Sequence, residues 1–277
     1  MHILILFLSG ISLGFAYILE KKLAQKKFHP ATLVVLVAAM SALISSPLLL
    51  YQFKVAHTWP YWILALGSII AYGLGNLFAF KAYALVNASV VGLINRLNIV
   101  FTVFIGILFL AETYRARSYF GLLLILIGSL MVVYKQGRFT IHKGIVFAVV
   151  TALGYGLAAV FDKVVLREFS PFTYIVLNNF LVALLFSTVR QARSEAWTLL
   201  RKHTLLIVLI SLFSASSWIG FLYVLQSGAV SKIFPIYDSL ALVCTVTLGI
   251  FFLKEKGNLI QKVAGTIAVI TGIFLLG

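Results

Sequence analysis

The chain has 277 residues, of which 62% are hydrophobic and only 10% are charged, and its mean hydropathy is +1.09. A soluble domain carries about 25% charged residues, so this composition excludes an ordinary soluble protein and indicates that the chain is surrounded by lipid. A net charge of +15 would point to nucleic acid in a soluble protein, but in a membrane protein basic residues gather in cytoplasmic loops, so we expect no nucleic-acid partner.

Apolar windows of about 17–25 residues, the length that crosses a bilayer as a helix, recur along the whole chain. Each is predicted to be a helix because lipid cannot satisfy an open backbone. The sequence therefore predicts an all-α polytopic membrane protein with ten transmembrane helices. In chain order, the predicted spans are Ile3–Leu19, Ala31–Tyr51, Tyr61–Leu85, Ala88–Ala111, Tyr119–Tyr134, Gly144–Leu166, Phe172–Val189, Leu205–Leu225, Ser231–Leu253 and Ile260–Leu276.

Two sequence patterns occur once in each half of the chain. YILEKKLAQKKFHP (17–30) and AVFDKVVLREFSP (159–171) each hold an acid, a lysine and an aromatic residue two positions before a proline. GILFLAE (106–112) and GIFFLKE (249–255) share a glycine and a final glutamate. Matched charges in the same order favour duplication over chance similarity between apolar sequences.

Glycines extend this pattern. The last predicted span of each half has two glycines seven residues apart, a spacing that places both on one helix face and allows close packing; they are Gly121 and Gly128, and Gly265 and Gly272. We therefore predict two five-helix repeats, residues 1–137 and 138–277. Because five is an odd number, the second repeat is expected to be inverted, as in many secondary transporters.

The basic residues predict an orientation. The loops after the odd-numbered spans, counted with the adjoining span ends, carry more than twice as many Lys and Arg as the alternate loops. Because basic loops face the cytoplasm, this count places both termini outside.

Two five-helix halves, each with a GxxFLxE turn followed by a glycine-containing last helix, resemble the EamA branch of the drug/metabolite transporter superfamily. The resemblance covers essentially the whole chain. It implies a central cavity lined by spans 1, 3, 4, 6, 8 and 9, two supporting spans, 5 and 10, and alternating access for a small metabolite. It also implies cytoplasmic termini, in contrast to the charge count.

Two charges stand well inside predicted spans. Asp238 lies about 10 Å and Arg96 about 12 Å from the nearer span end, at 1.5 Å per residue. Intramembrane charges need partners, and aligning the repeats brings these two positions toward each other from opposite faces. We expect Arg96 to face a wet cavity and pair with Asp238 until a substrate displaces it; a fixed structural pair or a snorkelling arginine is the alternative. The other six acids, Glu20 and Asp162 included, fall near predicted span ends.

Further polar and aromatic residues inside the spans are candidates for substrate binding or for helix-to-helix hydrogen bonds. They are Asn95, Asn98, Asn76, Tyr72, Tyr155, Trp218 and Tyr237. Lys81, near the end of span 3, is expected to snorkel to the interface.

These features predict a secondary transporter in the plasma membrane for a small polar metabolite, an amino acid or related zwitterion. An anionic nucleotide-sugar or phosphate-bearing substrate is the alternative, favoured if Lys81 joins Arg96 in the cavity. A membrane-embedded lipid-modifying enzyme or a non-transporting scaffold is less favoured. We expect no catalytic residues, no metal and no cofactor. Proton coupling through Asp238, exchange and facilitation stay open, as do oligomeric state and substrate identity.

Overall fold

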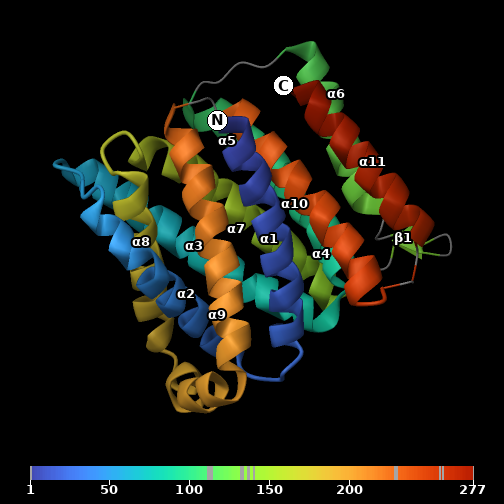
Figure 1. Cartoon of the computed structure of the whole chain (residues 1–277). Coiled ribbons are helices and arrows are strands. Elements are labelled where there is room, and N and C mark those ends of the chain that lie inside the picture. Colours follow the sequence, from blue (N-terminus) through green and yellow to red (C-terminus); the bar gives the residue numbers. More distant parts are fainter. Residues whose placement is uncertain are drawn as a thin grey trace.

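The computed structural model describes residues 2–110, 115–131, 134–135, 138–139, 141–227, 230–255, 257 and 259–276. Helices dominate this part of the chain (Figure 1), and a short antiparallel hairpin pairs Tyr134 with Phe139. The elements are α1 (His2–Ala24), α2 (Pro30–Ser45), the 3-10 helix η1 (Ser46–Leu50), α3 (Trp59–Leu85), α4 (Ala88–Asn95), α5 (Leu97–Leu110), α6 (Ala116–Met131), β1 (Tyr134–Lys135), β2 (Arg138–Phe139), α7 (Lys143–Val165), α8 (Pro171–Ser187), α9 (Arg190–Ser227), α10 (Val230–Phe252) and α11 (Leu259–Leu276).

Six helical segments of the described chain are long and apolar enough to cross a membrane: α1, α2 with η1, α3, α4 with α5, α7 and α9. Some of the other apolar helices are shorter, and α6 with its 16 residues is an example. At 1.5 Å per residue such a helix reaches about 24 Å, less than the hydrocarbon core of about 30 Å. The all-helical membrane architecture is confirmed, and the count of ten spans stays a prediction.

Two helices extend beyond their predicted spans. α1 continues past Leu19 to Ala24, so Glu20 and Lys21 lie within the helix. Lys21 can be buried there because its Nζ donates to the Tyr83 and Val86 carbonyl oxygens at 2.5 and 2.7 Å. α9 begins at Arg190, well before the predicted span, and its first turns run across the bundle (gold, bottom of Figure 1).

A kink joins the two parts of α9. His203 has non-helical angles (φ −136°, ψ 29°), and the helix changes direction there. Glu195 fixes the part before the kink by accepting hydrogen bonds from the His29 amide and the Thr32 hydroxyl. A hydropathy window misses this part because its polar residues lie at the membrane surface rather than in lipid.

The fourth predicted span is interrupted at Arg96. α4 ends at Asn95 and α5 begins at Leu97. The Arg96 amide donates to the Leu93 carbonyl at 3.2 Å, and the Ile99 amide donates to the Arg96 carbonyl at 3.1 Å, both i to i−3 bonds. Such a short 3-10 stretch inside a helix often marks a functional hinge.

The two halves interleave. α1 packs against α9 and α10, the third and fourth spans of the second half, and α7 packs against α3 and α5 in the same way. α2 packs against α8, and α6 lies against α11 (Figure 1). Because each first helix is enclosed by the other half, neither half keeps its buried surface when separated from the other.

Individual contacts also occur once in each half. Lys21 Nζ binds the Tyr83 carbonyl and Lys163 Nζ binds the Leu225 carbonyl, both across 62 residues of sequence. A Cβ placed on Gly14 would lie 2.6 Å from Cys244 Sγ in α10.

The corresponding glycine of α7 makes the equivalent contact. A Cβ on Gly156 would lie 3.0 Å from Phe101 Cβ in α5. The sequence repeat is therefore also a repeat of helix contacts.

The paired glycines bring α6 and α11 into backbone contact. A Cβ on Gly128 would lie 2.6 Å from the Gly265 carbonyl oxygen, and one on Gly265 would lie 2.7 Å from the Gly128 carbonyl oxygen. A Cβ on Gly272 would similarly lie 2.5 Å from the Gly121 carbonyl oxygen. The predicted glycine faces are confirmed, and they pack against each other.

Candidate functional site

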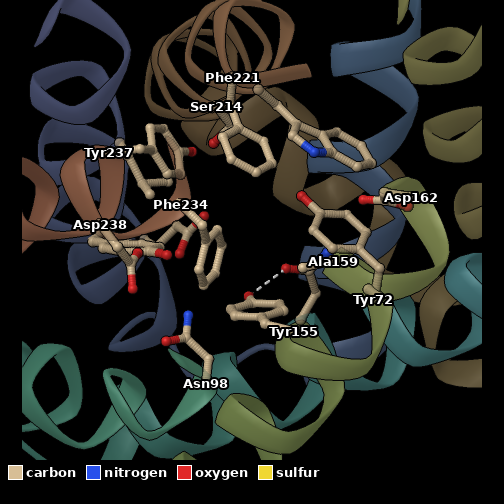
Figure 2. A pocket seen from close by; sticks show the side chains of 16 residues that line it. Tyr72, Asn98, Tyr155, Ala159, Asp162, Ser214, Phe221, Phe234, Tyr237 and Asp238 are labelled. Carbon is tan, nitrogen blue, oxygen red and sulfur yellow. Dashed lines mark hydrogen bonds between the residues drawn. The ribbon is translucent and has the colours of Figure 1, made fainter. Parts of the chain in front are cut away.

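A cavity of about 80 Å³ lies between the two halves (Figure 2). A buried water needs about 10–15 Å³ measured in this way, so roughly five to eight waters or a small metabolite fit. The lining comes from α1, α3, α5, α7, α9 and α10, the six helices that the family resemblance implied. The lining residues are Leu13, Tyr17, Glu20, Tyr72, Asn76, Asn98, Tyr155, Ala158, Ala159, Asp162, Ser214, Trp218, Phe221, Phe234, Tyr237 and Asp238.

Aromatic rings form much of the wall. Tyr72 stacks on Trp218 with ring centroids 4.6 Å apart, and Tyr155 lies 5.7 Å from Tyr72. Phe221 stacks on Tyr237 at 4.7 Å. The two pairs that include Tyr72 join helices of both halves, so this part of the wall depends on the way in which the halves interleave.

Hydrogen bonds fix two of the tyrosines. Tyr155 Oη donates to Asn76 Oδ1 at 2.7 Å, the bond drawn in Figure 2. The Tyr237 hydroxyl lies 2.9 Å from Ser217 Oγ, which in turn donates to the Ser9 carbonyl of α1. Both tyrosines are therefore held in place before any substrate binds.

Three carboxylates line the cavity, Glu20, Asp162 and Asp238. Asp162 and Asp238 lie on opposite sides of it (Figure 2). Asp162 Oδ1 accepts hydrogen bonds from Ser68 Oγ and Tyr174 Oη, each at 2.5 Å. Glu20 and Asp162 are the acids of the repeated acid–lysine pattern, so each half contributes one of them to the same cavity.

Arg96 is the largest fully buried side chain among the described residues, with 0% of it exposed, and it pairs with Asp238. Arg96 Nη1 contacts both the carboxylate and the carbonyl oxygen of Asp238, and Nε donates to the Gly92 carbonyl at 3.1 Å. Within the described residues Arg96 Nη2 and Asp238 Oδ2 have no hydrogen-bond partner. A buried pair with free hydrogen-bonding capacity on both sides is a site where a ligand or water gains contacts.

All of the predicted site residues except Arg96 and Asn95 line the cavity. The pairing of Arg96 with Asp238 is confirmed, but Asp238 separates the guanidinium from the cavity. Asn95 is buried beside Arg96, and its side-chain amide has no partner among the residues that the structure describes. Lys81 lies elsewhere, with Nζ 4.7 Å above the Phe78 ring.

Several polar and aromatic lining residues were not among the predicted site residues. They are Glu20, Asp162, Ser214, Tyr17, Phe221 and Phe234. Glu20 and Asp162 lie near helix ends as predicted, in α1 (His2–Ala24) and α7 (Lys143–Val165), but both also line the cavity, which a position near a span end did not indicate. Their matched places in the two halves were the signal that would have identified them.

Two interleaved halves of apolar helices around a polar cavity are the arrangement found in membrane transporters built from inverted repeats. Family comparison gives the same class: the model of the EamA-like transporter family matches residues 1–134 and again residues 142–277. The chain belongs to the EamA-like transporter family, and this membership makes it a multi-pass membrane transporter that acts on a small molecule.

Solved structures support the fold. Matches extend to 27 chains, among them one described as "Crystal structure of protein", which is 16% identical to this chain, with 96% of each chain covered and a TM-score of 0.66. At that identity the likeness concerns the fold alone. No curated protein matches the sequence.

Proposed function

We propose that the protein is a secondary transporter that moves a small polar metabolite bearing an amino group, amino acids and related zwitterions included, across the plasma membrane by alternating access. The observation that carries this proposal is the polar and aromatic cavity between the two halves. Transporters with inverted repeats bind substrate near the midplane, where the repeats meet and helices are interrupted. In this proposal the shorter apolar helices also cross the bilayer, which gives ten spans and the repeat boundaries 1–137 and 138–277.

The repeated lysine contacts support alternating access. Lys21 is buried and binds two carbonyls at the end of α3, whereas Lys163 is half-buried and binds the Leu225 carbonyl at the end of α9. Because the repeats are inverted, these contacts lie toward opposite faces of the membrane. Exchange of the two environments would close one face as the other opens.

The cavity lining favours an amino group over phosphate. The described lining contains carboxylates and no lysine or arginine. The anionic alternative would be favoured if Lys81 joined Arg96 in the cavity, but Lys81 lies over Phe78 and Phe147. A lipid-modifying enzyme would need reactive groups gathered at one membrane surface, whereas the polar groups described above gather inside the bundle.

A thermal-stability screen of the purified protein tests substrate binding. Amino acids, nucleotide sugars, organic cations and lipids are compared, since a ligand specific for the native state stabilises it by about 2.7 kcal/mol at one hundred times Kd. Compounds that raise the apparent Tm are then tested for counterflow in proteoliposomes, with and without a pH gradient to separate exchange from proton coupling. We expect saturable counterflow of an amino-group compound. Stabilising ligands that never exchange across the bilayer would contradict the proposal.

A further inference from the structure

Three oxygen atoms in the cavity wall have hydrogen-bonding capacity that the protein does not use. Asp238 Oδ2, Asn98 Oδ1 and Ser214 Oγ are buried and have no partner within the described chain. All three residues line the cavity, on different helices (Figure 2). Leaving a buried acceptor unsatisfied costs about 1–3 kcal/mol, so the site is complete only with a ligand that donates several hydrogen bonds.

The charged residues of the cavity wall determine which sign of charge on the ligand is favoured. Asp238 is paired with Arg96, which is 0% exposed, and the described lining adds the carboxyl groups of Glu20 and Asp162 but no lysine or arginine. Opposite charges attract strongly where the dielectric is low. A cation is therefore favoured, and a second carboxylate on the ligand is repelled.

The aromatic walls fit the remainder of such a ligand. The Tyr72–Trp218 and Phe221–Tyr237 stacks bound the cavity with ring faces and edges. Rings of this kind pack against hydrocarbon and attract an ammonium group placed over them. Among the described residues these walls offer no cation for a carboxylate, because Arg96 is paired with Asp238 and does not line the cavity.

We propose that this cavity recognises a primary ammonium group, with the alkyl or aryl body of the amine against the aromatic walls, and that a carboxylate on the substrate weakens binding. The unused oxygens on Asp238, Asn98 and Ser214 offer acceptors to the N–H donors of a primary ammonium. A quaternary ammonium has the charge but no donor. This inference rests on the proposed transport function and narrows its substrate class from zwitterions to amines.

The binding test compares matched ligands on the purified, full-length protein. Tyramine, phenethylamine and putrescine are each compared with the amino acid of the same side chain, tyrosine, phenylalanine and ornithine, and tyramine also with its N,N,N-trimethyl derivative. We expect at least one amine to bind at least ten times more tightly than its amino acid, and tyramine more tightly than its trimethyl form. Equal or tighter binding of the amino acids, equal binding of the trimethyl form, or no binding of any amine would overturn the inference.

Two variants assign the effect to the cavity. Ser214→Ala removes one of the unused oxygens, and we expect amine affinity to fall several-fold; Ser216→Ala, on the exposed side of the same helix, is the control and should bind as the unaltered protein does. Glu20→Gln should weaken amines about tenfold and leave amino acids unchanged or tighter. These variants keep the Arg96–Asp238 pair, so folding is not at issue. Unchanged amine affinity in both would overturn the assignment to this site.

Counterflow separates this inference from the transport function. Selective amine binding without counterflow would remove the transport proposal and keep the ammonium site. Counterflow of amino acids but not of amines would keep the transporter and overturn the ammonium site.

Discussion

Arg96 and Asp238 satisfy each other in an environment where either charge alone would be costly. Arg96 is fully buried, Asp238 is 2% exposed, and the pair lies where α4 passes into α5. Removing one partner of a buried pair typically costs about 3–5 kcal/mol, whereas replacing both by apolar residues is often neutral. The stability of this region therefore depends on keeping both charged partners or replacing both, more than on the presence of charges.

We predict that Arg96→Met alone lowers stability by about 3–5 kcal/mol, because Asp238 is left as an uncompensated buried charge. The double variant Arg96→Met/Asp238→Leu should regain most of that loss but bind no substrate. Apparent Tm and ligand-induced stabilisation of the purified variants measure the two effects. A double variant that still binds and transports would show that the pair is only structural.

The pair could be predicted from the sequence, whereas the acids Glu20 and Asp162 were missed. Arg96 and Asp238 interrupt long apolar runs, so their depth and the repeat alignment were enough to bring them together. Glu20 and Asp162 stand next to lysines near the ends of the apolar segments, a position that is typical of residues at the membrane surface. Their burial depends on carbonyls that other helices supply to Lys21 and Lys163, and such tertiary contacts have no local signature.

At the level of the helices, side-chain contacts at helix ends and breaks determine features that hydropathy does not predict. The C-terminal carbonyls of α3 are bound by Lys21, a cation at the negative end of a helix. Glu255 fixes the start of α4 by accepting hydrogen bonds from the Ala88 and Ser89 amides. These contacts hold helix ends that would otherwise leave backbone groups unsatisfied in lipid.

We predict that Lys21→Gln lowers stability by about 2 kcal/mol, since it removes two charge-assisted hydrogen bonds to α3. Lys163→Gln, the matched variant of the other half, should cost less because Lys163 is half-buried whereas Lys21 is buried. Apparent Tm values of the two proteins give the comparison. Equal losses of stability in the two variants would contradict the expectation that Lys21 stabilises the protein more than Lys163 does.

A second prediction concerns the contact of α6 with α11. Gly128→Ala should destabilise the protein by about 1–3 kcal/mol, because the added Cβ would lie 2.6 Å from the Gly265 carbonyl oxygen. Gly257→Ala is the control, since a Cβ there has nothing within 4 Å. Thermal unfolding of both variants in the same detergent measures the difference. If Gly128→Ala is as stable as the control, the helices can move apart at no cost.

The sequence predicted which segments are helices and which glycine faces pack, because both follow from residue type and spacing. It did not predict the break at Arg96 or the kink at His203. Both lie in segments whose residues are compatible with a helix. The departures from helical geometry arise from contacts with other helices. Arg96 must reach Asp238, and the helix before His203 must turn to lie against α2.

For the whole molecule, interleaving makes the two halves one folding unit. α1 is enclosed by α9 and α10, and α7 by α3 and α5, so each half buries its first helix in the other. A repeat in the sequence does not reveal this arrangement, because tandem repeats also form separate domains. Inversion could be predicted, since an odd number of spans leaves no other choice, but which face is cytoplasmic depends on the translocation machinery and membrane potential.

The excess of basic residues in alternate loops predicts that both termini lie outside. Epitope tags added at each terminus should therefore bind antibody on intact cells, and binding should not increase when the cells are permeabilised. The two ends lie at the same end of the bundle (Figure 1), so the tags should agree. Tags detected only after permeabilisation would instead favour the cytoplasmic termini that the family resemblance implies.

The contact between Gly14 and Cys244 gives the protein a reporter of its own. Cys244 is the single cysteine of the chain and lies half-buried where α1 meets α10. Its alkylation rate should therefore measure how often those helices part, without any added label or engineered thiol. Slower alkylation in the presence of a compound would identify it as a ligand that holds α1 and α10 together. Faster alkylation would identify a ligand that separates them.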